Sequence, residues 1–274
     1  MNSLDRVSRA SALNRLTSDR LLRQNAIYLT GTLVAGGLGY VFHFVAGRML
    51  GPAQYGVVAA AVAALYLLNL PALIVQTVSA RFTSVAAGRG LRGNIPGLVF
   101  QLSALGLMVG AVICIALLIA SGPLSSYLQI ADRRVIAVLA LASLVALLVS
   151  TARGALQGLQ RFVALSINVS VDMVTRLASL VGLVLAGLGA LGGVVALVAG
   201  PAFAYAQSLF LFRGMGEAQP AHRASIAQLG RYAALATAGA IGTTYLYNID
   251  VLLSKHYLVA SSAGIYAAAS VLGR

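Results

Sequence analysis

The chain has few charged residues for its length. Asp, Glu, Lys and Arg make up 9% of its 274 residues, while 59% are hydrophobic and the mean hydropathy is +0.90. Such a composition leaves too little charge to cover the surface of a soluble domain of this size. The apolar residues fall in uninterrupted runs near the length of about 20 residues that spans a bilayer as a helix. These runs do not alternate as barrel strands would, so we predict an all-α integral membrane protein.

Other scarcities disfavour whole classes of chemistry. The chain has one cysteine, Cys114, so it forms no internal disulfide. It has one glutamate, no His or Cys cluster with metal-ligand spacing, no phosphate-binding loop and no Gly-x-Ser-x-Gly motif. No loop is long enough to hold a nucleotide-binding or catalytic domain. We therefore predict no enzyme activity, no catalytic residue, no cofactor and no metal site.

The basic residues that are present report topology. The formal net charge is +13, but the arginines lie mainly in short segments between apolar runs, which disfavours a nucleic-acid partner. We predict spans over residues 26–46, 57–79, 98–120, 135–150, 163–186, 191–212 and 230–249, with an eighth starting near 262. With the N-terminus inside, 13 basic residues fall on the cytoplasmic side: Arg6, Arg9, Arg15, Arg20, Arg23, Arg81, Arg89, Arg92, Arg153, Arg161, Arg213, Arg223 and Arg231. Only Arg48, Arg133, Arg134 and Lys255 fall outside, so we predict a cytoplasmic N-terminus.

An internal repeat organises the chain. Residues 229–274 match residues 21–66 without gaps at an offset of 208 positions: Arg23 matches Arg231, Gly31 matches Gly239, Leu50 matches Leu258 and Gly56 matches Gly264. Several further matches are Ala on Ala, so chance resemblance is the alternative. Six spans separate the copies, an even number, so both enter the membrane in the same direction. The repeat predicts one complete six-helix lobe plus the first one or two helices of a parallel second lobe.

This repeat sets the predicted domain boundaries. Residues 1–25 form a cytoplasmic basic segment, which is either a helix lying on the anionic inner leaflet or a disordered tail. The first lobe covers 26–212, a cytoplasmic linker 213–229, and the start of a truncated second lobe 230–274. Pro71 and Pro201 fall inside spans and are expected to bend them. Gly182 and Ala186 have the small-xxx-small spacing that permits close helix contact.

The strongest candidate site is a charged face in the fifth span. Asn168, Asp172 and Arg176 are spaced one turn apart, with Asp172 about 12 Å and Arg176 about 18 Å from the cytoplasmic edge. A charge at such depth costs about 2.5 to 3.5 kcal/mol, so it must pair or meet water. Two interpretations stay open: an intrahelical Asp172–Arg176 pair that only neutralises itself, or a face that lines a wet central cavity.

Four further residues are weaker cavity candidates, each with a simpler explanation. His43 near the outer end of the first span is either a proton carrier or a packed or interfacial histidine. Asp250 near the outer end of the seventh span is either a gate contact or an interfacial residue. Arg81 near the inner end of its span either lines a cytoplasmic mouth or only marks topology. Arg161 either meets a phosphate of a lipid or of the substrate or only marks topology.

Three stretches resemble one family. Residues 47–56 (GRMLGPAQYG), 157–162 (QGLQRF) and 248–253 (NIDVLL) with 263–269 (AGIYAAA) are similar to the polysaccharide biosynthesis and oligosaccharide flippase family of the multidrug/oligosaccharidyl-lipid/polysaccharide (MOP) exporter superfamily. The resemblance implies two six-helix lobes around a central cavity, and movement of a lipid-linked sugar across the bacterial inner membrane by alternating access. The chain departs from that pattern because most of a second lobe is missing and few charged residues are available for a cavity.

The resemblance leads to one leading hypothesis and three others. We expect a transporter that flips or exports a lipid-linked oligosaccharide or polysaccharide precursor, as a monomer of the two-lobed chain with membrane lipid around it. In it, Arg176 attracts the phosphate of the substrate, Asp172 holds Arg176, and Asn168 contacts sugar or water. The alternatives are a cation-coupled multidrug exporter of the same superfamily, a membrane-embedded glycan transferase or ligase, and a non-transporting scaffold.

Overall fold

The protein was analysed as a computed structural model, which describes residues 3–90, 93, 95–127, 130, 132–213 and 249–272. Within these residues the chain forms α-helices and no strand, and six of the helices are long and apolar enough to cross a membrane. The prediction of an all-α membrane bundle is confirmed. The expected linker, 213–229, and the expected seventh span, 230–249, lie almost wholly outside the described residues.

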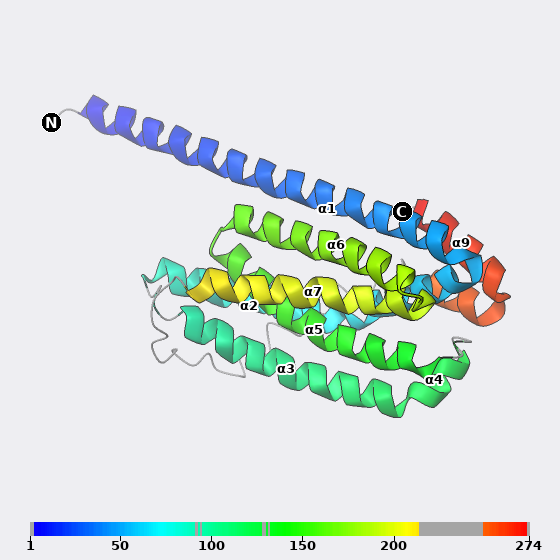
Figure 1. The fold of residues 1–274 in the computed structure, drawn as a ribbon. Coiled ribbons are helices and arrows are strands. Elements are labelled where there is room, and N and C mark those ends of the chain that lie inside the picture. Colours follow the sequence, from blue (N-terminus) through cyan, green and yellow to red (C-terminus); the bar gives the residue numbers. More distant parts are fainter. Residues whose placement is uncertain are drawn as a thin grey trace.

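The first helix, α1 (Ser3–Leu68), contains two segments joined by a sharp turn. Gly51 has φ 71° and ψ 171°, a conformation that glycine adopts without a side-chain clash. Pro52 then begins the returning segment, where its missing N–H is not needed. The predicted turn between the first two spans is therefore where α1 reverses, and we call this end of the bundle the turn end (Figure 1). The basic N-terminal segment is helical from Ser3 and continues straight into the first span, projecting beyond the bundle (Figure 1).

The second span is longer than the sequence predicted. It consists of the returning part of α1 and of α2 (Leu70–Gly88), separated by a break at Asn69. Pro71 stands in the first turn of α2, so the predicted bend lies directly before it. The helix continues to Gly88, so the expected loop from residue 80 was wrong in its first nine positions, and Arg81 lies on a helix.

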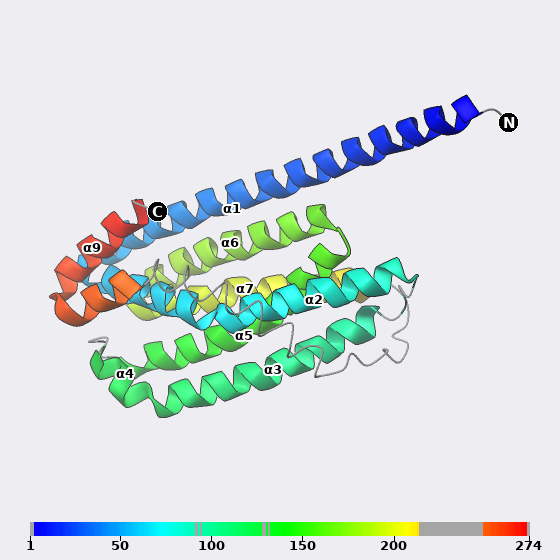
Figure 2. The same ribbon diagram turned by 180° about the vertical axis from the view of Figure 1, so that it is seen from behind.

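The remaining spans follow the predicted order. They are α3 (Ile95–Ile119), α5 (Arg133–Gly158), α6 (Phe162–Leu185) and α7 (Gly189–Arg213), with a short helix α4 (Ser121–Tyr127) at the turn end. α5 lies in the middle of the bundle, against α2, α3 and α7, while α6 packs between α1 and α7 (Figures 1 and 2). The fourth span was predicted to end at residue 150, but α5 runs eight residues further because its last turns pack tightly on α2.

Glycines on α5 make that tight contact possible. A Cβ atom at Gly154 would overlap the carbonyl oxygen of Gln76, and one at Gly158 would overlap that of Ala80. The two glycines, one turn apart, let α2 and α5 approach to backbone contact, and the Ser79 hydroxyl then donates to the Thr151 carbonyl at 2.7 Å. The expectation for Gly182 was wrong, since no atom lies within 4 Å of a Cβ built there.

The last described helices dock on the first at the turn end. Residues 249–257 are helical, and α9 (Ala260–Leu272) packs against the returning part of α1. A Cβ at Gly56 would meet the Ala260 oxygen at 3.2 Å, and a Cβ at Gly264 would overlap the Pro52 oxygen. These four residues are two pairs related by the 208-residue offset, and each contact is the counterpart of the other. Such reciprocity is what a twofold axis between the two copies produces.

Candidate functional site

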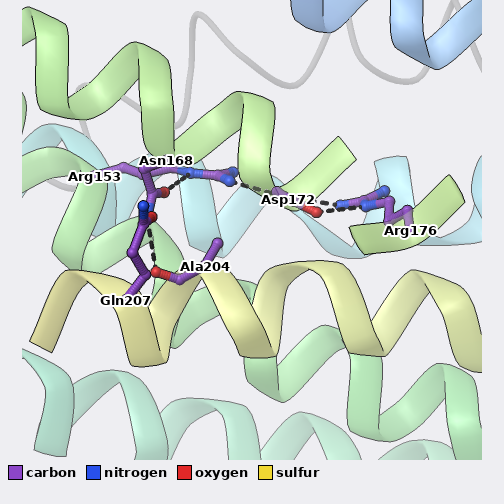
Figure 3. A network of polar contacts seen from close by, with 6 residues as sticks. All are labelled: Arg153, Asn168, Asp172, Arg176, Ala204 and Gln207. Carbon is purple, nitrogen blue, oxygen red and sulfur yellow. Dashed lines mark hydrogen bonds and ion pairs between the residues drawn. The ribbon is translucent and has the colours of Figure 1, made fainter. Parts of the chain in front are cut away.

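The charged face of α6 is part of a buried network that joins three helices (Figure 3). Asp172 has no exposed surface and accepts hydrogen bonds from two arginines. Arg176, one turn further along α6, donates from Nε at 2.7 Å and from Nη2 at 3.3 Å. Arg153 on α5 donates from Nη2 at 2.7 Å to Asp172 Oδ2, the oxygen that also accepts from Arg176 Nη2. The predicted Asp172–Arg176 pair is therefore present, and a third charge joins it.

The network continues through Asn168 to α7. The Asn168 Oδ1 atom accepts from Arg153 Nε at 3.0 Å, and its Nδ2 group donates to the Ala204 carbonyl at 2.7 Å and to Gln207 Oε1 at 3.0 Å (Figure 3). Asn168 is also fully buried, so its amide is held by protein groups on both sides. Because every contact crosses from one helix to another or ties neighbouring turns, the network fixes α5, α6 and α7 relative to one another.

A glycine on α7 provides the space for the ion pair. A Cβ at Gly200 would overlap both Asp172 Oδ1 and the Cγ atom of Arg176. Pro201 follows directly and lies inside α7, where it removes one backbone N–H. The Gly200-Pro201 pair thus leaves room on α7 for the charged side chains of α6.

Arg153 was assigned to a cytoplasmic loop because the fourth span was predicted too short. The side chain lies on α5 facing α6, and 16% of it is exposed. The available signal was the Gly154-xxx-Gly158 spacing, which indicates a packed helix beyond residue 150. The Asp172–Arg176 pair also gave a hint, because one carboxylate can accept hydrogen bonds from two guanidinium groups.

The network carries an excess positive charge. Two arginines surround one carboxylate, and the Arg176 side chain keeps 23% of its surface exposed while Asp172 keeps none. An anion that reached this site would therefore meet Arg176 or Arg153, and not the carboxylate.

A separate cavity of about 600 Å³ lies between α1, α6 and the last described helices. Its lining includes His43 and Val251, and also Ala59 and Ala267, which are two pairs related by the 208-residue offset. The cavity therefore lies on the same axis as the glycine contact. Its lining residues on α1 belong to both segments, Thr32 to His43 before the turn and Ala59 to Tyr66 after it, and all are further along the chain from Gly51 than Gly56 is.

His43 is the histidine among the described residues that line this cavity. Its Nδ1 atom shares a hydrogen bond with the buried Tyr55 hydroxyl at 3.0 Å, so the ring is held in place beside the turn of α1. Tyr40, Tyr66 and Met173 also line the cavity, and none of the described residues in its lining is charged. The structure places His43 apart from the charged network, although Met173 on α6 is the direct neighbour of Asp172 in sequence.

The other three candidates lie elsewhere. Asp250 accepts from the hydroxyls of Tyr266 at 3.2 Å and Ser270 at 3.1 Å, and so ties residues 249–257 to α9. Arg81 is exposed on α2, and Arg161 is exposed directly before α6. The structure thus brings together Asn168, Asp172 and Arg176 from the predicted set. It also reveals a contact that sequence reasoning missed: the His256 ring stacks on Tyr127 of α4, with 4.1 Å between ring centres.

No metal site is evident among the described residues, since nowhere in them do three His, Cys, Asp or Glu side chains gather. The donor set of the network is also wrong for a cation, because its one carboxylate already accepts from two arginines.

Comparison with known proteins identifies the family. The model of the polysaccharide biosynthesis protein family matches residues 21–273. The chain belongs to the polysaccharide biosynthesis protein family. The predicted membership is therefore confirmed, and the match covers the repeat, the network and the cavity together. No curated protein sequence matches the chain.

Solved structures share the fold of this family member. A multidrug resistance MATE family transporter of the MOP superfamily matches in its inward-facing conformation with 12% identity and a TM-score of 0.64, over 89% of this chain and 56% of that one. The outward-facing conformation of such a transporter matches with 12% identity and a TM-score of 0.61, over 90% and 62%. A chain described only as "protein A" matches with 15% identity and a TM-score of 0.67, over 92% and 59%. The chain thus shares the fold of these structures and spans 56 to 62% of their length.

Proposed function

We propose that this family member is a membrane transporter that moves a lipid-linked oligosaccharide or polysaccharide precursor across the bacterial inner membrane, with its N-terminus in the cytoplasm. The observation that carries the proposal is the family match over residues 21–273, together with six helices among the described residues that are long and apolar enough to cross a membrane. The solved structures with the same fold are transporters, which supports transport as the class of activity.

The arrangement at the axis supports alternating access. The two copies of the repeat meet at the turn end through Gly56 and Gly264, and the α1 residues that line the cavity of about 600 Å³ lie further from the turn than Gly56 does. A cavity that is closed at one end by a small-residue contact opens to the other side when the contact separates. Closely packed helices without bulky side chains between them can part without rebuilding a core.

The charged network supplies the attraction for an anionic substrate in this proposal. Arg176 contacts a phosphate of the carrier, because it is the most exposed charged member of the network. Asp172 and Asn168 are positioning residues, since both are fully buried and their polar atoms are already bonded. Arg153 shares the positive charge and holds α5 against α6.

A complementation experiment tests the function and the site separately. Deletion of the gene should reduce surface polysaccharide and leave lipid-linked intermediates in the inner leaflet, and the natural protein should restore export. Arg176→Ala should abolish that rescue while the protein still inserts in the membrane. Arg134→Ala is the control, because the Arg134 side chain is 81% exposed and its ion pair with Asp132 is a long 3.9 Å. Unchanged export with Arg176→Ala overturns the site, and normal polysaccharide in the deletion strain overturns the function.

A cation-coupled multidrug exporter is the second candidate. The observation that favours it is the similarity to MATE family transporters, although identities of 12% carry only the fold. The deletion strain separates the two, since this candidate predicts a change in drug sensitivity with surface polysaccharide intact.

A further inference from the structure

A groove runs along the exposed side of α6 and α7, separate from the cavity of about 600 Å³ that His43 lines. One hollow of about 310 Å³ is lined by Arg161, Val163, Ile167 and Gln207, and a second of about 450 Å³ by Ile167, Val174, Thr175 and Phe203. Ile167 lines both hollows, so they are direct neighbours along α6. We call the two together the α6–α7 groove.

The two ends of the α6–α7 groove differ in chemistry. The end at the start of α6 has a guanidinium group from Arg161 and amides from Gln160 and Gln207. Among the described residues Arg161 forms no ion pair. The Gln207 Oε1 atom is used by Asn168, which leaves its amide N–H groups as donors for the groove. Together these groups suit a phosphate.

The other end of the groove is apolar. Val174 is 53% exposed and Phe203 58% exposed, and Ile167 at the junction is 50% exposed. Ile167 and Val174 lie on α6 and Phe203 on α7, two helices that are long and apolar enough to cross a membrane, so an alkyl chain is the occupant that matches them. The groove therefore fits an amphiphile whose phosphate lies at the start of α6 and whose chain points toward the turn end.

The length of the groove favours an ordinary phospholipid. From Arg161 to Thr175 is fourteen helical residues, or about 21 Å. Half of a bilayer of about 40 to 45 Å including headgroups is about 20 to 22 Å, which is the depth of a single leaflet. We propose that the α6–α7 groove binds one anionic phospholipid of the leaflet at the N-terminal end of the bundle.

This site touches the charged network through Gln207. A phosphate that accepts from the Gln207 amide N–H also fixes the Gln207 side chain, whose Oε1 atom accepts from Asn168. Asn168 in turn accepts from Arg153 through Oδ1. The bound lipid is thereby expected to stabilise the orientation of α7 against α6. This inference does not depend on what the protein transports.

Fluorescence quenching tests the proposal directly, because the chain contains no tryptophan. Phe203→Trp places a single reporter in the apolar end of the groove, and Leu107→Trp, at a position 47% exposed on α3, is the control outside it. The chain is reconstituted in vesicles that contain phosphatidylcholine or phosphatidylglycerol with brominated acyl chains. The ratio of quenching constants for the two lipids then reports the local preference for an anionic headgroup.

We expect a preference of about fivefold for the anionic lipid at the groove reporter, the factor that corresponds to about 1 kcal/mol for one basic residue at an anionic surface. Arg161→Gln in the Phe203→Trp background should reduce the ratio to that of the Leu107→Trp control, while Arg161→Lys should keep most of it. Equal ratios at the two reporters, or a preference that survives Arg161→Gln, would overturn the proposal. So would displacement of the brominated phospholipid by a polyprenyl phosphate at low mole fraction, since the occupant would then be a substrate carrier.

Discussion

Asp172→Asn is the substitution that tests the buried network most sharply. The carboxylate is fully buried and accepts from Arg153 at 2.7 Å and from Arg176 at 2.7 and 3.3 Å. The amide has nearly the same shape but no charge, so two guanidinium groups would share a buried site without a counter-ion. Removing one partner of a buried pair costs about 3 to 5 kcal/mol.

This magnitude separates two explanations of the network. If its three contacts acted only as hydrogen bonds within a membrane protein, at about 0.6 kcal/mol each, the loss would stay under about 2 kcal/mol. A loss of 3 to 5 kcal/mol corresponds to a fall of roughly 6 to 20 °C in the melting temperature for a chain of this size. We therefore expect the larger shift.

Thermal unfolding in detergent provides the assay. Cys114 on α3 is the one cysteine of the chain and is partly buried, so a thiol-reactive dye reports unfolding without an added label. Asp132→Asn is the matched control, because Asp132 is 47% exposed and its ion pair with Arg134 is a loose 3.9 Å. Asp172→Glu keeps the charge and should recover part of the loss. Equal melting temperatures for Asp172→Asn and Asp132→Asn would refute the idea that charge pairing holds these helices.

Three further predictions follow from other contacts. Arg153→Lys should destabilise the protein more than Arg134→Lys in the same thermal-unfolding assay, because one ammonium group cannot bond to Asn168 and Asp172 together as the guanidinium does. Equal melting temperatures for these two variants would contradict this role of Arg153. Gly264→Ala should lengthen the distance between spin labels at positions 53 and 261, which are both exposed at the turn end, because the added methyl group overlaps the Pro52 carbonyl. Gly36→Ala is the control and should leave this distance unchanged, because no atom lies within 4 Å of a Cβ at Gly36. The same distance in both variants would argue against the glycine contact. Tyr55→Phe should lower the free energy of unfolding by about 0.5 to 1.5 kcal/mol, because the hydrogen bond to His43 is lost. Thermal unfolding measures this loss, with Tyr40→Phe as the control. No difference between the two variants would show that the hydrogen bond contributes nothing to stability.

Much of the fold could be predicted because hydrophobic run length and loop charge act locally. The predicted span of residues 163–186 differs from α6 by one residue at each end, and 191–212 falls within α7. The errors arose where tertiary packing extends a helix past its apolar run. α5 continues through Arg153 because Gly154 and Gly158 pack on α2, and α2 continues through Arg81 to Gly88.

The candidate site shows the same division. The helical period placed Asn168, Asp172 and Arg176 on one face and predicted the pair within α6, which the structure contains. The partner from α5 depends on how two helices pack, which no local pattern specifies. The offset of 208 residues predicted two related copies, but only the three-dimensional arrangement brings Gly56 against Gly264.

Lipid translocation by the purified natural protein tests the central claim most directly. The protein is reconstituted in vesicles with a fluorescent lipid-linked oligosaccharide, and a membrane-impermeant glycosidase measures how much of the sugar becomes accessible. We predict that accessibility rises in vesicles with the natural protein and with Arg134→Ala, and stays at the level of protein-free vesicles with Arg176→Ala. No rise with a folded, correctly inserted natural protein would contradict the transport of a lipid-linked glycan.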